Sequence, residues 1–377
     1  MCGIVSYFGK KDAVPILIDG LKRLEYRGYD SAGIAVIDRD RIHLRRSVGK
    51  IDALTARIQS QPLKGNIGIG HSRWATHGAS TEANAHPHTT DQVAIVHNGI
   101  IENHQELRNA LEKKGVTFSS ETDSEVIVHL VTDFLNQGFG PLEAAFKTFS
   151  YLKGAFAVAI MFRDHANMLI CGRQGSPLAI GLGDHEMFVG SDALSLSSLT
   201  HKLIYLEEGD TAILHSDSYM IYDRDREIVD RPIMTSHVTG ESVSKGAYPH
   251  FMLKEIHEQP DVIRRIIHQF VRKENFDLHI DFDWSQIKHV TFVACGTSFY
   301  AAQIAQNWFE SIARINTRVE IASEFRYRRP PLSPHGVTFV ISQSGETADT
   351  LAALRYAKAQ QQTVIALVNV EESTIAR

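Results

Sequence analysis

The arrangement of expected strands and helices changes once along the chain, and this change constrains the fold more than any other feature. Up to residue 223, alternating apolar residues predict strands in consecutive runs, with the helical patterns grouped apart from them. Such grouping is typical of an α+β layered domain. Over residues 286–377, expected strands alternate with expected helices, as in a doubly wound α/β sheet. The sequence therefore predicts two domains of different classes.

The boundaries of these domains follow from composition and pattern. The layered domain is expected over residues 2–223, followed by a polar linker over 224–248 and a helical connector over 249–285. The doubly wound domain then occupies 286–377. Its last expected strand is Thr363–Val370, and an apolar parallel strand needs a covering helix. We therefore expect this domain to be incomplete and the chain to be truncated.

Composition excludes several classes of protein. The 377 residues are 43% apolar and 22% charged, which fits an ordinary globular protein of two or three domains. The net charge of −5 argues against a nucleic-acid binder. The longest apolar stretch, Ala155–Phe162, is far shorter than the roughly 20 residues that span a membrane. Only three cysteines occur, too few for a disulfide scaffold, so we expect a cytoplasmic protein.

Cys2 is the first candidate catalytic residue. Removal of the initiator methionine would leave this cysteine at the amino terminus. Its α-amino group, with a pKa near ~7.7, could then act as the general base for its own thiol. A cysteine at the second position by chance remains the alternative.

Three further runs add groups that suit an amino-acid substrate. Arg73 follows a strand, where its guanidinium could hold a carboxylate, although a surface ion pair is the alternative. Asn98 and Gly99 stand at an expected strand-to-turn transition, where a side-chain amide and a backbone N–H could bind an oxyanion, or simply form a hairpin turn. Asp123 stands at a helix start, either as an N-cap or as a partner for an ammonium group.

Together these runs resemble the class II glutamine amidotransferases. The matching segments are residues 2–5 (CGIV), 26–33 (YRGYDSAG), 71–78 (HSRWATHG), 84–88 (NAHPH), 97–99 (HNG) and 122–123 (TD). The resemblance implies an N-terminal-nucleophile (Ntn) hydrolase fold, an αββα sandwich. In that fold Cys2 is the nucleophile, and Asn98 with Gly99 forms the oxyanion hole.

The same resemblance implies a glutamine-binding set. Arg73 would bind the α-carboxylate of L-glutamine and Asp123 its α-ammonium group, with the loop residues Trp74, Thr76 and His77 also at the glutamine site. Trp74 would gate a passage for ammonia. No cofactor is implied.

The histidines of this half permit a different interpretation, a metal site. The candidates are His71, His77, His86, His88, His97 and His104. No pair has the helical i, i+4 spacing of a zinc protease, and no Cys-x-x-Cys occurs. We therefore expect no metal, and structural hydrogen bonds for these side chains.

Two hydroxyl-rich loops mark the second half. Residues 294–298 (ACGTS) follow one apolar strand and residues 342–347 (SQSGET) follow another, and each leads into a helix. Backbone N–H groups and hydroxyls at helix starts suit an anion, and the absence of Gly-x-Gly-x-x-Gly and Gly-Lys-Ser/Thr motifs favours a phosphate monoester over a nucleotide. Helix capping by Ser and Thr is the alternative for either loop alone.

These loops, with residues 320–327 and 254–260, resemble the sugar-isomerase (SIS) domain and its junction in amidotransferases that aminate a phosphosugar. The resemblance implies that D-fructose 6-phosphate and L-glutamine give D-glucosamine 6-phosphate and L-glutamate, the start of hexosamine synthesis, in a homodimer. The phosphate would be held by Thr297, Ser298, Ser342, Gln343, Ser344 and Thr347.

Two alternatives remain from the sequence. One is a glutaminase half that serves another acceptor, and the other is a module that only binds a phosphosugar. Because the family's remaining sugar-site residues lie beyond these 377, we expect the chain alone to hydrolyse glutamine without making amino sugar.

Overall fold

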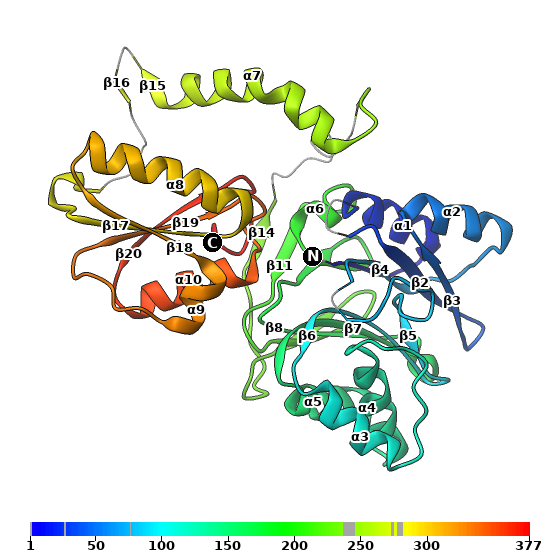
Figure 1. Cartoon of the computed structure of the whole chain (residues 1–377). Helices are drawn as coiled ribbons and strands as arrows, with labels where there is room; N and C mark the ends of the chain where they lie inside the picture. Colours follow the sequence, from blue (N-terminus) through cyan, green and yellow to red (C-terminus); the bar gives the residue numbers. More distant parts are fainter. Residues whose placement is uncertain (1, 26–27, 76, 237–245, 273–274, 277–281) are drawn as a thin grey trace. The chain divides into compact units, whose positions relative to one another are not determined.

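The computed structural model describes residues 2–25, 28–75, 77–236, 246–272, 275–276 and 282–377. It forms two compact units, Met1–Gly240 and Glu241–Arg377, shown in Figure 1. Thr76 and residues 237–245 of the expected linker lie outside the described residues. Among the described residues, every helix is too short or too polar to cross a membrane.

The first unit contains two sheets. One has eight strands in the order β14-β11-β9-β10-β1-β4-β2-β3, and the other has six in the order β13-β12-β8-β7-β6-β5. The strands are β1 (Gly3–Phe8), β2 (Ser31–Asp38), β3 (Arg41–Val48), β4 (Ile67–Arg73), β5 (His88–Thr89), β6 (Val93–Ile101), β7 (Gly154–Phe162), β8 (Leu169–Gln174), β9 (Ala179–Leu182), β10 (Met187–Gly190), β11 (Lys202–Tyr205), β12 (Thr211–Leu214), β13 (Tyr219–Tyr222) and β14 (Ile233–Thr235).

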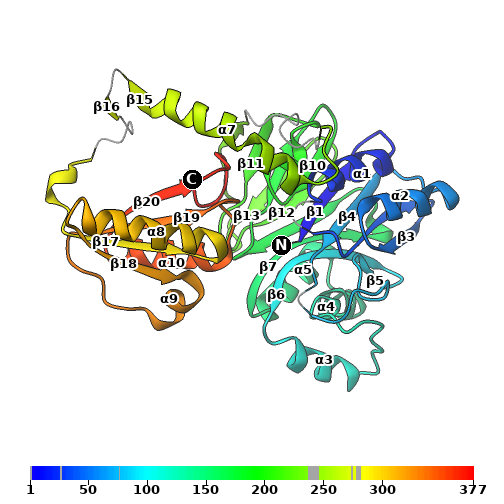
Figure 2. The same ribbon diagram turned by 45° about the horizontal axis from the view of Figure 1, so that its top comes forward.

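Helices cover the outer face of each sheet, as Figures 1 and 2 show. One group packs with the eight-stranded sheet around the cluster of Val5, Leu17 and Leu54, and the other packs with the six-stranded sheet around Val93 and Val131. The helices are α1 (Ala13–Arg23), α2 (Ile51–Ser60), α3 (His104–Glu112), α4 (Glu125–Asn136), α5 (Pro141–Tyr151), the 3-10 helix η1 (Arg163–His165) and α6 (Ala193–Leu196).

The period of two residues in a strand explains the layering. In β1, Ile4 and Phe8 point into the core between the sheets, whereas Val5 and Tyr7 point toward the helices. Both faces of β1 are therefore covered, and all six of its residues are buried. This four-layer αββα arrangement confirms the fold class expected for the first domain.

The first unit extends further than expected. Strand β14 pairs antiparallel with β11 and forms the edge of the eight-stranded sheet. Just before it, Arg231 forms an ion pair with the buried Asp210, at 2.8 Å between Nη2 and Oδ1. The expected boundary at residue 223 is therefore too early, because the polar composition of 224–248 hides a short edge strand.

The second unit contains a parallel sheet in the order β18-β17-β19-β20. Around Phe292 and Phe339, α8 packs on one face, and around Val293 and Val340, α9 and α10 pack on the other. This is the doubly wound class expected. The elements are α7 (Phe251–Phe270), β15 (Val271–Arg272), β16 (Asn275–Phe276), the 3-10 helix η3 (Trp284–Gln286), β17 (His289–Ala294), α8 (Gly296–Ser311), β18 (Asn316–Ile321), α9 (Ala322–Arg328), β19 (Val337–Ser342), α10 (Ala348–Ala359) and β20 (Thr363–Val368).

Candidate functional site

Cys2 lies directly before β1, in the middle of the eight-stranded sheet. Strand β1 pairs with β4, which ends at Arg73, so the chain after β4 passes beside Cys2. There the Trp74 backbone N–H donates to the Cys2 Sγ at 3.3 Å. Antiparallel pairing thus brings together two sites that are 72 residues apart in sequence.

The pKa of the Cys2 thiol is raised above its ordinary value. Burial raises its pKa, while the hydrogen bond from Trp74 and the charge of Arg73 act in the opposite direction. Because the thiolate is the nucleophilic form, this sulfur needs a nearby base to attack a substrate at neutral pH. An α-amino group on the same residue would meet that need.

Asn98 approaches Cys2 from the other sheet. Its Nδ2 donates to the Cys2 backbone O at 3.1 Å and to the Ser191 Oγ at 2.9 Å, and its Oδ1 lies 3.0 Å from His71 Nε2. Both amide hydrogens therefore already have acceptors. An oxyanion bound by Asn98 would share or replace one of them.

The location of Asn98 and Gly99 differs from expectation. Both lie inside β6, opposite Ala157 and Phe156 of β7, and not at a turn. Gly99 has a φ of +136°, and a Cβ there would stand 1.9 Å from the Ala155 carbonyl oxygen. Only glycine fits this approach. The run His-Asn-Gly resembles a hairpin turn in sequence, but the apolar strand continues through it to Ile101.

Arg73 is buried, with 4% of its surface exposed. Its Nη1 donates to Ala79 O at 3.1 Å, and its Nη2 donates to the carbonyl oxygens of His77 and, at 3.3 Å, Gly78. Among the described residues it forms no ion pair with a carboxylate. Because its contacts within the described part of the chain are carbonyl oxygens, this buried guanidinium could also bind a substrate carboxylate.

Asp123 is also buried, and its role differs from an N-cap. Helix α4 begins at Glu125, and no side chain caps it. Instead, Asp123 Oδ2 accepts the Ile101 backbone N–H at 2.7 Å, and its Oδ1 lies 3.9 Å from His77 Nδ1. The carboxylate thus lies beside the end of β6 and the loop after β4, where an ammonium group could join it.

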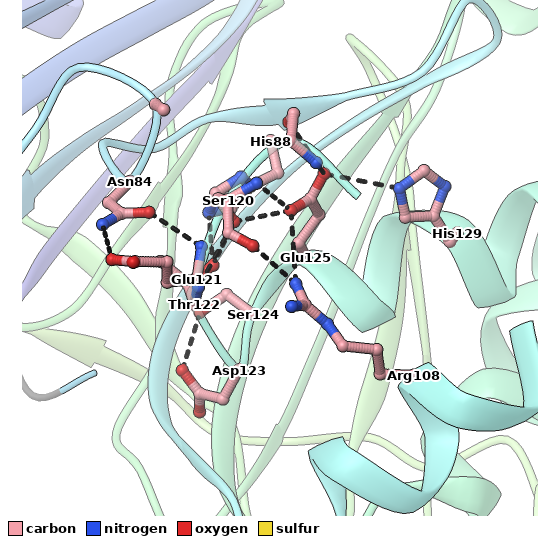
Figure 3. Close-up of polar contacts among 12 residues, drawn as sticks. Asn84, His88, Arg108, Ser120, Glu121, Thr122, Asp123, Ser124, Glu125 and His129 are labelled. Atoms are coloured by element: carbon pink, nitrogen blue, oxygen red, sulfur yellow. Dashed lines mark hydrogen bonds and ion pairs between the residues drawn. The ribbon is translucent and has the colours of Figure 1, made fainter. Parts of the chain in front are cut away.

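Glu125 holds the loop that carries Asp123 (Figure 3). Its two oxygens accept the backbone N–H and hydroxyl groups of Ser119 and Ser120, at 2.6–2.8 Å. Arg108 adds its charge at 3.8 Å and donates to Ser120 O. Although burial acts to raise the pKa of Glu125, hydrogen bonds from His129 and the two serines hold it well below its usual range. The loop is thereby fixed around a buried charge.

Asn84 joins this loop to the one held by Arg73 (Figure 3). Its Oδ1 accepts the Glu121 N–H at 2.9 Å, and its Nδ2 donates to Ala79 O at 2.9 Å and to Glu121 Oε2 at 3.1 Å. Arg73 and Asn84 therefore share the Ala79 carbonyl. The expected carboxylate-binding and ammonium-binding residues belong to one connected network.

Four of the candidate histidines, His71, His86, His88 and His97, form a buried cluster. The ring centroid of His86 lies 4.1 Å from that of His71 and 4.6 Å from that of His88. Burial lowers the pKa of His71 and His88 to about 3, and it lowers those of His86 and His97 as well. Within the described part of the chain, no group of three or more His, Cys, Asp or Glu side chains is arranged to hold a metal.

The roles of two residues at the site, Ser191 and Asn84, were not predicted from the sequence. Ser191 joins β1 to Asn98, because its Oγ also accepts the Ile4 N–H at 2.7 Å. The run Gly190-Ser191-Asp192 after an apolar strand is the only local sign of it. Asn84 lies in a matching motif, but no role for it could be read from its neighbours.

In the second unit, the topology places the two hydroxyl-rich loops together at the carboxyl ends of the parallel strands. Strands β17 and β19 are parallel neighbours, and their crossovers leave in opposite directions, to β18 and to β20. The carboxyl ends at such a switch point form a crevice that binds ligands in open α/β sheets. Residues 295–298 and 342–347 both lie at these carboxyl ends.

The second loop is shaped by its own side chains. Ser342 Oγ accepts the Gly345 N–H at 3.0 Å and lies 3.0 Å from Thr347 Oγ1. Thr347 is at the N-cap position of α10 without a capping side-chain bond, and Ser344 and Gln343 are at least partly exposed. In the first loop, Thr297 is exposed and Ser298 partly so, in the first turn of α8. These hydroxyls can face an anion.

Each half of the chain matches the model of a known domain family. Residues 71–198 match the model of the glutamine amidotransferase domain, and residues 284–377 match that of the SIS domain. Curated relatives named glutamine–fructose-6-phosphate aminotransferase (isomerizing) are 50% identical in Brucella suis biovar 1 (strain 1330) and in Mesorhizobium japonicum, and 49% identical in Zymomonas mobilis. Each match covers 100% of this chain and 63% of the relative, so the chain spans less than two thirds of their length.

Solved structures support the fold. Glutamine phosphoribosylpyrophosphate amidotransferase from Bacillus subtilis, complexed with ADP and GMP, superposes with a TM-score of 0.55 over 98% of this chain and 81% of that one. The sequence identity is 19%, so the likeness concerns the fold alone.

Proposed function

We propose that this chain, a homologue of the glutamine–fructose-6-phosphate aminotransferases that contains a glutamine amidotransferase domain and a SIS domain, hydrolyses L-glutamine at Cys2. The observation that carries the proposal is the convergence on Cys2 of the Trp74 N–H and the Asn98 amide, from two different sheets. Neither contact is needed for a cysteine that only packs.

The reaction balances with the groups at hand. With Met1 removed, the α-amino group of Cys2 takes the thiol proton, and the sulfur attacks the carbon of the glutamine side-chain amide. The C–O double bond opens to an oxyanion, to which Asn98 Nδ2 and the Gly99 N–H donate. The C–N bond then breaks, and the proton leaves with ammonia. Water finally cleaves the thioester, releasing glutamate and restoring the thiol.

Specificity for glutamine follows from two oppositely charged side chains, which match the α-carboxylate and the α-ammonium group of the substrate. Arg73 binds the α-carboxylate and Asp123 the α-ammonium group, and both are buried enough for these contacts to be strong. His77, 3.9 Å from Asp123, and Trp74 border the same site, to which we also assign Thr76.

We propose that a longer protein, with the full length of the relatives, transfers this ammonia to D-fructose 6-phosphate. The loops at the ends of β17 and β19 would hold the phosphate through Thr297, Ser298, Ser342, Gln343, Ser344 and Thr347. Their location at a topological switch point supports this assignment. The product is D-glucosamine 6-phosphate.

We also propose that the longer protein is a homodimer. Tyr300, Ile304 and Trp308 form a row of exposed apolar side chains at i, i+4 spacing on α8, each more than half exposed. Contiguous apolar surface of this kind marks protein interfaces.

The test is a paired assay on one sample, with glutamate release and amino-sugar formation measured together. The 377-residue chain should release glutamate and form no glucosamine 6-phosphate. Cys2→Ala should abolish glutamate release while the melting temperature stays within a few degrees. Mass spectrometry of an active sample should find Cys2 at the amino terminus, and retained Met1 in such a sample would contradict the mechanism.

A further inference from the structure

His71 is a buried histidine that the proposed reaction does not use. It lies in β4 with 0% of its surface exposed. Its Nε2 is 3.0 Å from the His97 carbonyl oxygen and 3.0 Å from Asn98 Oδ1. A ring nitrogen this close to two acceptors must carry a hydrogen.

The direction of the Asn98 amide can be checked independently. On its other side, the amide faces the Cys2 carbonyl oxygen, which only accepts hydrogen bonds. If the amide were flipped, its oxygen would face that carbonyl and its NH₂ would face the hydrogen on His71. The arrangement with Oδ1 toward His71 and Nδ2 toward Cys2 is therefore the one that satisfies both neighbours.

The protonation state of His71 supports the same arrangement. Burial lowers its pKa to about 3, so the ring is neutral near pH 7 and carries a single hydrogen. Its Nδ1 is buried and has no hydrogen-bond partner among the described residues. Nothing there competes for the hydrogen, which stays on Nε2. The ring of His86, 4.1 Å away between centroids, packs against it.

Ser191 holds the amide from the side. Its hydroxyl oxygen accepts from Asn98 Nδ2 at 2.9 Å and from the Ile4 N–H at 2.7 Å, and the residue is 1% exposed. The chain of contacts thus runs from His71 on β4 through Asn98 on β6 to Cys2, with Ser191 fixing the remaining hydrogen.

We infer that His71 is a positioning residue for glutamine hydrolysis, because its Nε2–H fixes the Asn98 amide with the NH₂ group toward Cys2. This inference rests on the proposed glutaminase function. The direction of the amide matters because an NH₂ group stabilises a developing oxyanion, whereas an amide oxygen in its place would repel it. The effect belongs to the transition state and so to kcat, not to glutamine binding.

The first experiment compares two substitutions of similar length in the 377-residue chain. Gln in His71→Gln can place a donor NH₂ where the Nε2–H stood, whereas Met in His71→Met cannot donate. We expect His71→Met to lower the kcat for glutamate release about 10- to 100-fold with KM unchanged, as for the loss of one buried hydrogen bond near an oxyanion. His71→Gln should retain most of the kcat.

Two controls separate positioning from simple loss of stability. His88→Met removes another buried histidine, bonded to Thr122 Oγ1 at 3.0 Å and not to Asn98, so it should lower the melting temperature but not kcat. In an Asn98→Ala background, His71→Met should cause no further fall in kcat, because His71 acts through Asn98.

The outcomes are distinct. Equal losses of kcat in His71→Gln and His71→Met, a rise in KM alone, or a full further loss in the Asn98→Ala background would overturn the positioning role while the glutaminase function stands. A parent chain that starts at Cys2 and releases no glutamate would overturn the proposed function and this inference with it.

Discussion

The glutamine site and the hydroxyl-rich loop of the second unit are built in opposite ways. Hydrogen bonds around Cys2 join residues 72 to 187 positions apart, across strands of two sheets. In the loop 342–347, the hydroxyls bond to groups only two to five residues away. The first site therefore depends on the whole αββα unit, whereas the hydroxyls of the second are arranged by near neighbours in sequence. The loop 342–347 is also joined to residues near position 375, because Thr374 N–H donates to Glu346 Oε1 at 2.8 Å and Ile375 N–H donates to Gly345 O at 3.0 Å.

The difference extends to charge. The first site is supported by neutral buried histidines, a buried Arg73 and a buried Glu125. Among the described residues of the second unit, no histidine is fully buried, and its loop donors are hydroxyls and backbone N–H groups. Because the fully buried histidines lie in the first unit, we expect the first unit to be the more sensitive of the two to mild acid.

The largest expected effect is acid destabilisation confined to the first unit. The folded-state pKa of His71 and of His88 is about 3, below the unfolded value near 6.5, so the unfolded chain binds protons first as the pH falls. The stability is fully present above about pH 6.5 and is lost as the pH falls from there toward the folded pKa. Between pH 7 and pH 5, the free energy of unfolding of the first unit should fall by about 2 kcal/mol for each of these histidines.

Denaturant unfolding at the two pH values, followed by hydrogen exchange in each unit, measures this effect. His88→Gln should reduce the pH dependence of the first unit. Equal acid sensitivity in the two units would contradict the comparison.

Arg73→Ala tests the buried charge directly. Removing one partner of a buried charged contact costs about 2–5 kcal/mol, so KM for glutamine should rise steeply with a smaller change in kcat. Steady-state kinetics of glutamate release gives both constants. Arg163→Ala is the control, because that arginine pairs with Asp164 at the surface and should leave KM unaltered. An unchanged KM in Arg73→Ala would assign Arg73 to holding the loop 77–79 alone.

Ser342→Ala should have the smallest effect. It removes the acceptor of the Gly345 N–H and should lower the free energy of unfolding of the second unit by about 1 kcal/mol. Because its contacts are local, kcat and KM for glutamate release should not change. Calorimetric melting and the glutaminase assay test the two statements, and a changed KM would show that the two regions are coupled.

Sequence alone predicted the elements whose pattern is local. Apolar alternation predicts strands over 2–8, 155–162 and 211–214, and helical spacing predicts helices over 13–25, 124–136 and 347–361. The bounds of β1, β7, β12, α1, α4 and α10 differ from these ranges by at most two residues at either end. Short elements without a clear period were not predicted, including α6, α9, β11 and β14. Strand β14 is held by pairing with β11, a partner about thirty residues earlier that no local pattern indicates.

For the site, the sequence identified the residues that carry chemistry, because Cys, Arg, Asn and Asp are distinctive in short motifs. Cys2, Arg73, Asn98 and Asp123 all belong to the first unit's network of contacts. Sequence could not place Asn98 inside β6, nor tell that Asp123 accepts from Ile101 instead of capping α4.

What the sequence determined is therefore the kind of chemistry and the two classes of domain, since both follow from residue types and periods within short windows. The tertiary structure decided which supporting side chains contact the residues that carry this chemistry. Ser191 and His71 reach Asn98 because β10, β1 and β4 are adjacent in one sheet and β6 lies in the other. Burial between the sheets then fixes the protonation and direction of those groups, because a buried polar atom must find its partner inside the fold.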